Sequence, residues 1–361
     1  MDEALDRLSA YRFTDGPGMA VHAPMGAEAL TSLGMAEAVP AWVDAYAARH
    51  VPIEAPPRHA PLADADGPVD GPATEPVAAD AAWRAALGDP ARLTDWSDLF
   101  GRLLVEEPWP SVVARWVPRL VAGYAGALTH GLLRTAHAVR TLEASGDRPS
   151  ALALGELATG LAYWAGTYRR LPGAPRPSGR LDLAAAIEAV PRPAEPWSPL
   201  EAGTFARLHE LGGFPAAVDA LAPPASPDPV GDLTLTFSRA LLARPAAVIP
   251  LVHTVTPAVA SRTLLPYAPE LTVAALYAQL WQVDAAIVAG FTSPGPALPP
   301  RTGDDEAADV PTPGDLAAQA AAHGDPHAVK FTEAALREHA HRPDDTYLLA
   351  ARQVLVALPP W

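Results

Sequence analysis

Hydrophobic residues recur at three- and four-residue spacings along most of the chain, which is the spacing of one face of an α-helix. The pattern is clearest in residues 26–50, 98–144, 152–171 and 271–291, all rich in the helix formers Ala and Leu. Alternating strand-like patterns are scarce, and the best of them, DLTLTF at 232–237, fits a helix equally well. We therefore expect an all-α protein.

Two stretches lack this periodicity and are dense in Pro, Asp and Gly: residues 52–79 and 293–313. Such a composition is typical of loops, and we expect both stretches to be mobile. Histidines that could carry chemistry lie on both sides of each stretch, so neither needs to separate two domains. We expect a single large helical domain over residues 1–361.

The charge of the chain bears on its partners. The formal net charge is −15 and the pI is near 5.1, so no basic stripe is available to bind nucleic acid or an anionic membrane. No uninterrupted apolar run reaches the roughly 18 residues that span a bilayer, because Asp284 interrupts the best candidate. The start, MDEALDRLSAY, lacks the apolar stretch of a signal peptide. We expect a cytoplasmic protein.

The chain has no cysteine, which excludes disulfides, thiolate metal sites, iron–sulfur clusters and a Cys nucleophile. The nucleotide-binding glycine motifs, GxSxG and HExxH are absent as well. Any metal would depend mainly on the 11 histidines and on carboxylates.

Two histidines and an arginine share one helical stripe in ALTHGLLRTAHAVR. His130 and His137 are seven residues apart, with Arg134 between them. Their Cα atoms should be about 10.5 Å apart along the helix axis, which is far for two ligands of one ion. Two satisfied core histidines are the plain structural alternative. The desolvation cost of burying all three side chains favours a site.

Lys330 is the only lysine in the chain, within GDPHAVKFTEAALREH. Asp325 should cap a helix whose first residue is Pro326, which places His327 and Lys330 on one face near the N-terminus. There the helix dipole disfavours an ammonium group, and burial lowers the pKa of a lysine in the same direction. A neutral amine could form a Schiff base, act as a general base or react with CO2 to give a carbamate. The alternative is a GC-rich genome that favours Arg codons over Lys codons and left one lysine by chance.

Two further histidines lie next to prolines. His253 lies between Pro250 and Pro257, and Pro257 should kink a helix beside it. His22 lies just before a helix that Pro24 opens. Taken singly, each is more typical of a core histidine than of a ligand.

Together these segments resemble the questin oxidase-like family. The resemblance is carried by HAPMGAEALTSLG, WRAALGD, ALTHGLLRTAHAVRTL, LAYWAGTYRRLPG, LVHTVTPA and HAVKFTEAALRE, which run from about residue 20 to 340. One departure is Val21, where the family pattern has Asn, and this puts the support of His22 in question.

The resemblance implies an all-helical oxygenase of polyketide metabolism that opens an aromatic ring, such as that of an anthraquinone, by oxidative or Baeyer–Villiger-like chemistry. Since no flavin motif is present, a metal held between helices is expected to activate O2. Imidazoles with one hard oxygen donor suit iron(II), although zinc or another divalent metal could bind. NADPH is a candidate electron donor.

On this resemblance the expected metal ligands come from a set of six residues, and one or two of them should instead orient a ligand or substrate. His327 and one of the pair His130 and His137 are the candidates for that supporting role. Lys330 would be a carboxylated ligand, and Arg134 would stabilise a phenolate or an enolate. The six expected ligands are His22, His130, His137, His253, His327 and Lys330.

Two other functions remain open from the sequence. One is a metal-free lyase in which Lys330 is the Schiff-base nucleophile. The other is a non-catalytic protein that binds an aromatic polyketide. Four aromatic residues could contact a flat ligand, but ordinary core packing accounts for them as well: Tyr163, Trp164, Tyr277 and Trp281.

Overall fold

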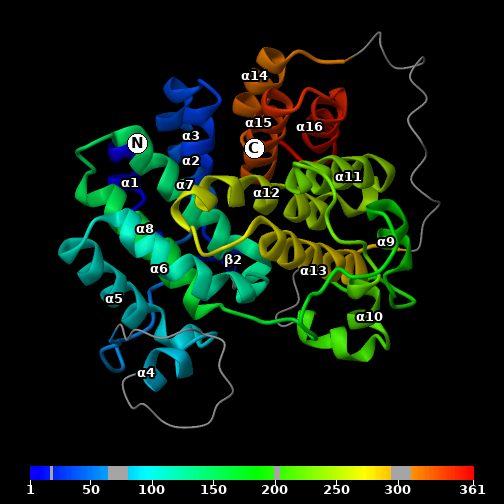
Figure 1. The fold of residues 1–361 in the computed structure, drawn as a ribbon. Helices are drawn as coiled ribbons and strands as arrows, with labels where there is room; N and C mark the ends of the chain where they lie inside the picture. The colour runs from blue at the N-terminus through cyan, green and yellow to red at the C-terminus, as the bar shows by residue number, and fades with distance from the viewer. Residues whose placement is uncertain (17–18, 64–79, 199–203, 294–309) are drawn as a thin grey trace. The chain divides into compact units, whose positions relative to one another are not determined.

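In the computed structural model the protein is built from α-helices and short 3-10 turns (Figure 1), which confirms the all-α prediction. The structure describes residues 1–16, 19–63, 80–198, 204–293 and 310–361. Within them the one sheet is a two-stranded antiparallel hairpin of β1 (Thr14–Asp15) and β2 (Met19–Ala20), which the sequence did not predict. DLTLTF lies within helix α11 (Pro229–Ala243).

The chain divides into two compact units. The first comprises Met1–Glu28, Pro40–Arg170 and Ala260–Leu271, and the second comprises Ala29–Val39, Leu171–Val259 and Thr272–Trp361. Two of the boundaries fall inside helices α2 (Ala23–Ser32) and α12 (Val248–Leu264), and another falls after the first residue of α3 (Val39–Arg49). The single domain expected from the sequence stays a prediction, and the two units are described one at a time.

The first unit is organised around the pair α7 (His130–Ser145) and α8 (Ala151–Gly166), with α5 (Leu93–Glu106) packed on α8. Ser150 caps α8 by accepting a hydrogen bond from the backbone N–H of Ala153. Its other helices are α1 (Asp2–Arg7), α3 (Val39–Arg49), α4 (Asp80–Ala85) and α6 (Trp109–Leu120), with short turns η2 (Pro90–Arg92), η3 (Val121–Gly123), η4 (Gly126–Thr129) and η7 (Leu265–Tyr267).

Large aromatic side chains fill the core beneath α5 and α6. The rings of Trp96, Phe100 and Trp83 each lie edge-on or nearly edge-on to Trp116, with centroids 5.0 to 5.7 Å apart. All four are fully buried. Edge-to-face packing of this kind stabilises a core beyond the burial of area alone.

The second unit contains α14 (Pro313–His323), α15 (Pro326–His341) and α16 (Asp345–Ala357), which pack on one another, while α11 packs on α16. Asp325 caps α15 and Pro326 is its first residue, which confirms the sequence prediction. The remaining elements are η1 (Ala36–Ala38), α9 (Leu183–Ala189), η5 (Thr204–Glu210), α10 (Phe214–Asp219), η6 (Pro245–Ala247) and α13 (Val273–Phe291).

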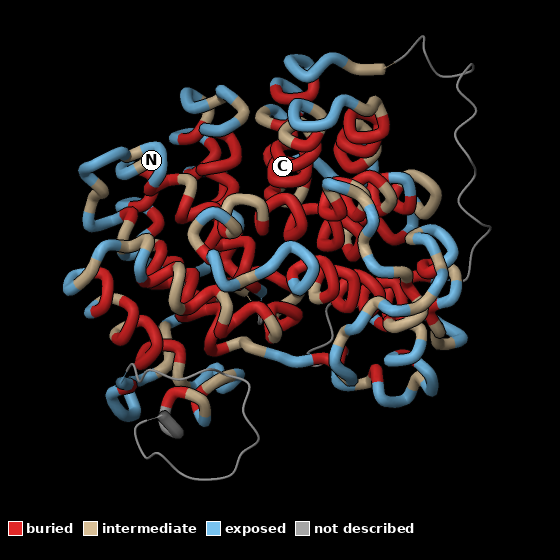
Figure 2. The backbone as a smooth tube through the Cα atoms, viewed as in Figure 1, coloured by how far each residue is buried: buried red, intermediate tan, exposed pale blue. Residues whose placement is uncertain are grey.

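Some of the helices are buried along much of their length. Figure 2 shows long buried stretches on α7, α8 and α13. The segment Pro245–Tyr267 and helix α13 are long and apolar enough to cross a membrane by length and composition, although 78% of each apolar window is buried inside the protein. The core helices of water-soluble proteins pass the same test. The predicted absence of a membrane partner and the cytoplasmic location stay predictions.

The Pro-rich stretches are described only in part. Residues 52–63 are irregular and touch β1 through a bridge from Pro52 to Asp15, as expected for a loop. Residues 64–79 and 294–309 lie outside the described residues, so the predicted mobility of these loops stays a prediction there.

Candidate metal centre

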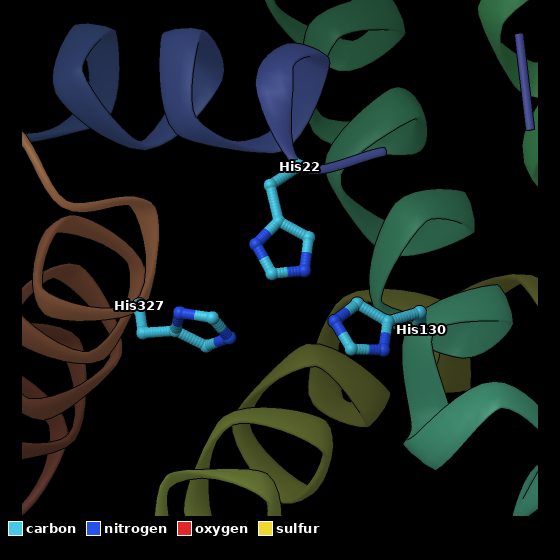
Figure 3. Close-up of side chains that lie close together, drawn as sticks. All are labelled: His22, His130 and His327. Carbon is cyan, nitrogen blue, oxygen red and sulfur yellow. The ribbon is translucent and has the colours of Figure 1, made fainter. Parts of the chain in front are cut away.

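Two buried imidazoles lie against each other in the first unit. His22 directly precedes the first residue of α2, and His130 is the first residue of α7. Their ring centroids are 4.7 Å apart and the ring planes are 17° from parallel (Figure 3). The sequence placed His22 just before a helix and His130 on a helical stripe with His137, but only folding brings the rings of His22 and His130 together.

The tautomer of His130 follows from one hydrogen bond. Its Nδ1 lies 2.6 Å from the carbonyl oxygen of Ala127. A carbonyl oxygen only accepts hydrogen bonds, so Nδ1 carries a proton, and in the neutral imidazole the lone pair is then on Nε2. This is the arrangement in metal-binding histidines, where one ring nitrogen donates to a carbonyl or carboxylate and the other binds the metal.

The backbone at His22 is held by a buried polar chain. The His22 N–H donates to the Tyr46 hydroxyl at 3.1 Å, and that hydroxyl donates to the carboxylate of Asp15. The imidazole of His50 lies 3.3 Å from the same carboxylate and stacks on the Tyr46 ring. Burial raises the pKa of Asp15 and also that of Tyr46.

The sequence predicted no role for this chain of groups. No local signal could have found it, because its members are brought together from separate segments. The side chain of His50 is in fact 29% exposed and contacts the buried carboxylate of Asp15.

His137 binds a carboxylate. Its Nδ1 is 2.6 Å from Oε2 of Glu28, and Arg140 donates to both oxygens of that side chain. Burial by itself would raise the pKa of Glu28, but the hydrogen bond from His137 and the nearby positive charges lower it below its usual value. His130 contacts His22 whereas His137 contacts Glu28, in keeping with the axial separation predicted for these two histidines.

Arg134 is buried between carboxylate and carbonyl oxygens. Its Nε and Nη2 donate to the two carboxylate oxygens of Glu156 at 2.6 and 2.8 Å, and Nη1 donates to the carbonyl of Arg12. This bidentate pair fixes the guanidinium in place. Its stabilisation of a substrate anion stays a prediction from the family resemblance.

The second unit holds another histidine pair. His253 on α12 and His327 in the first turn of α15 have ring centroids 5.7 Å apart with planes 80° apart. Pro257 lies inside α12 and has no N–H to donate to the carbonyl of His253. Burial lowers the pKa of His327, which favours the neutral imidazole that binds metals. Figure 3 also draws the His327 side chain.

Lys330 lies one turn beyond His327 on α15 and is 4% exposed. Burial lowers its pKa to about 7, although Asp325 opposes the shift, so the predicted direction is confirmed. No hydrogen-bond partner for its Nζ is found among the described residues. With this pKa, about half of the Lys330 side chains are neutral at pH 7. The neutral amine is the form that reacts with CO2 or a carbonyl.

The cap of α15 holds the residues before Lys330 in place. The Asp325 carboxylate accepts from the backbone N–H groups of His327 and Ala328 at 2.8 and 3.1 Å. Burial by itself would raise the pKa of Asp325, but its interaction with His327 and these N–H bonds lower it. The first turn of α15 is therefore a fixed support for both His327 and Lys330.

The aromatic residues that could have contacted a flat ligand are all buried. Trp281 donates from its indole nitrogen to the carbonyl of Val218 at 2.9 Å, as a core tryptophan does. The four are Tyr163, Trp164, Tyr277 and Trp281.

Comparison of the sequence with models of known protein families and with curated proteins gives no match.

The donor atoms present suit a divalent metal of intermediate softness. In the first unit the imidazoles of His22 and His130 offer nitrogen donors. The second unit, taken by itself, offers the imidazoles of His253 and His327 and the amine of Lys330. Imidazole suits iron, zinc and copper, and a carbamate on a lysine would add a hard oxygen donor.

Proposed function

We propose that the protein is a metal-dependent oxygenase of the questin oxidase-like kind, with non-haem iron as its metal. The observation that carries this proposal is the buried pair of parallel imidazoles, His22 and His130, in which the tautomer of His130 leaves Nε2 as the donor. Two neutral ligands with fixed orientation are what a catalytic iron site needs from the chain.

The substrate class follows from the sequence resemblance. An aromatic polyketide such as an anthraquinone would be opened by O2 in an oxidative or Baeyer–Villiger-like step, with NADPH as a candidate electron donor. When bound, iron would supply the activation of O2. The chain itself holds His22 through the Tyr46 hydroxyl and Asp15, and it holds His130 through the Ala127 carbonyl.

In this proposal Lys330 reacts with CO2. Its neutral Nζ forms a bond to the carbon of CO2 and releases one proton, giving a carbamate with an anionic oxygen. The helix N-terminus favours this anion over the ammonium group.

Removal of the amine by Lys330→Ala should therefore weaken iron binding, and bicarbonate or a short carboxylic acid should partly restore it. Full iron binding by Lys330→Ala would contradict the carbamate.

The central test is metal content after anaerobic purification and reconstitution with Fe(II). We expect bound iron in the wild-type protein, loss of at least ten-fold in iron affinity in His22→Ala and His130→Ala, and no change in His209→Ala, which alters an exposed histidine. His327→Ala tests the prediction that the second unit also supplies ligands. An iron-free wild-type protein that consumes no O2 with an anthraquinone would overturn the proposal.

A metal-free lyase is the second candidate, and the buried amine of Lys330 with a pKa of about 7 favours it. A neutral amine attacks a substrate carbonyl to form a Schiff base. Borohydride reduction in the presence of a carbonyl substrate should then add the substrate mass to the peptide that contains Lys330. A trapped adduct without any metal requirement would favour this second function.

A further inference from the structure

The three residues before His130 have an unusual backbone. Ala127, Leu128 and Thr129 have φ values of 47°, 48° and 70°, and they are the only non-glycine residues with positive φ in the part of the chain that the structure describes. This left-handed conformation is unfavourable for each of them, because their Cβ atoms crowd the following carbonyl. Three such residues in succession need support from their surroundings.

Close packing against the end of α8 provides that support on both sides of the turn. A Cβ on Gly126 would lie 1.6 Å from the carbonyl oxygen of Thr167, and a Cβ on Gly131 would lie 2.4 Å from the Cα of Trp164. Only glycine permits approaches this close. The backbone N–H of Arg169 also donates to the carbonyl of Gly123 at 2.9 Å. The turn is thus fixed at its start and at its end.

The turn directs one carbonyl at His130. The oxygen of Ala127 accepts both from the backbone N–H of His130 and, at 2.6 Å, from its ring Nδ1. Two bonds from one residue to one acceptor set the ring's tautomer and its rotation about χ1 and χ2. The ring then lies parallel to that of His22.

We propose that residues 127–129, which we call the left-handed turn, are a positioning element that locks His130 in the Nδ1–H tautomer and presents Nε2 as a metal donor. The tautomer of His130 is inferred from the hydrogen bond to Ala127 alone. The role of the turn in metal binding rests on the proposed function. The strain in the turn is the cost of placing the Ala127 carbonyl where a relaxed helix start would not place it.

The first test is the tautomer in metal-free protein, read from ¹⁵N chemical shifts and two-bond couplings of the histidine side chains. We expect a protonated Nδ1 and an unprotonated Nε2 for His130, with the resonances identified by their loss in His130→Gln. An Nε2–H tautomer would overturn the proposal. Because this measurement needs no metal, a correct tautomer in a protein that binds no metal would refute the proposed function and the turn's role toward a metal, but not the tautomer itself.

The second test relaxes the turn without removing any hydrogen-bonding group. Ala127→Gly and Leu128→Gly retain the Ala127 carbonyl and permit positive φ, so the melting temperature should be unchanged or higher. The ring of His130 becomes less fixed, and Co(II) affinity, measured from the metal's visible absorption, should fall about ten-fold, as when a group that orients a metal ligand is lost. Gly155→Ala on α8 is the control, since a Cβ there meets nothing within 4 Å. Unchanged Co(II) affinity in both glycine variants would overturn the positioning role.

Discussion

At the scale of single residues, two buried ionisable groups show what burial does to charge. Lys330 and Asp284 are both buried, and burial shifts the pKa of each toward its neutral form. The lysine was singled out by the sequence because it is unique, and its neutral form gives it a chemical use. Asp284 interrupts an apolar helix, and no role beyond that interruption was predicted for it.

Asp284 predicts a pH-dependent stability. Burial raises its pKa well above 3.8, and its Oδ2 has no hydrogen-bond partner among the described residues. The folded protein therefore keeps this proton at pH values where the unfolded chain loses it, so its contribution to stability is full below about pH 4 and falls as the pH rises. The fall cannot exceed about 1.4 kcal/mol per pH unit.

Asp284→Asn removes this titration. The free energy of unfolding of Asp284→Asn should therefore increase progressively relative to that of the wild type from pH 4 to pH 7, as measured by urea denaturation. Asp147→Asn, on an exposed residue, is the control and should follow the wild-type profile. Parallel profiles for Asp284→Asn and the wild type would show that the Asp284 carboxyl ionises in the folded protein much as it does in the unfolded chain.

At the scale of elements, the ends of helices carry the chemistry. His22, His130 and His327 all lie at or within the first turn of a helix or directly before it. A helix start is a fixed piece of backbone whose N–H groups need partners, so a cap there also fixes nearby side chains. The step Asp325–Pro326 correctly predicted one such helix start, because a capping sequence is a local pattern.

Experiment can distinguish the cap of α15, which we expect to affect both stability and iron binding, from a cap that affects stability alone. Asp325→Ala should lower the free energy of unfolding by about 1 kcal/mol and also weaken iron binding, since the first turn that carries His327 loosens. Asp344→Ala removes the cap of α16, whose carboxylate accepts from the N–H of Thr346 at 2.9 Å, and should cost similar stability without weakening iron binding. Equal iron affinity in the two variants would remove His327 and Lys330 from the set of ligands.

The hairpin β1–β2 and the left-handed turn were not predicted at this scale. Both are short, and neither carries the alternating pattern of longer strands. The Asp15–Gly16 step is a hairpin signal that was not used, whereas the left-handed turn has no such signal. The turn contains no glycine at positions 127–129, so its conformation is set by packing on α8 and not by the preference of its residues.

At the scale of the whole molecule, metal binding should raise the stability of the folded protein. A ligand that binds only the folded state stabilises it by about 2.7 kcal/mol at a hundred-fold excess over its Kd. Addition of Fe(II) without oxygen, or of Co(II), should raise the melting temperature by some degrees, and a chelator should reverse the rise. The double variant His22→Ala with His130→Ala should lose the effect, and a rise that persists in it would place the metal elsewhere.

The sequence by itself determined the helical class, the capped start of α15 and the residues able to bind a metal, because periodicity, caps and residue chemistry are local properties. Only the tertiary structure decided which groups meet: His130 with His22, His137 with Glu28 109 positions away, and the His22 backbone with Tyr46. Such contacts join segments that are distant in the chain, and they depend on how helices pack. No local pattern encodes that packing, and the tautomer of His130 and the lowered pKa of Lys330 depend on it.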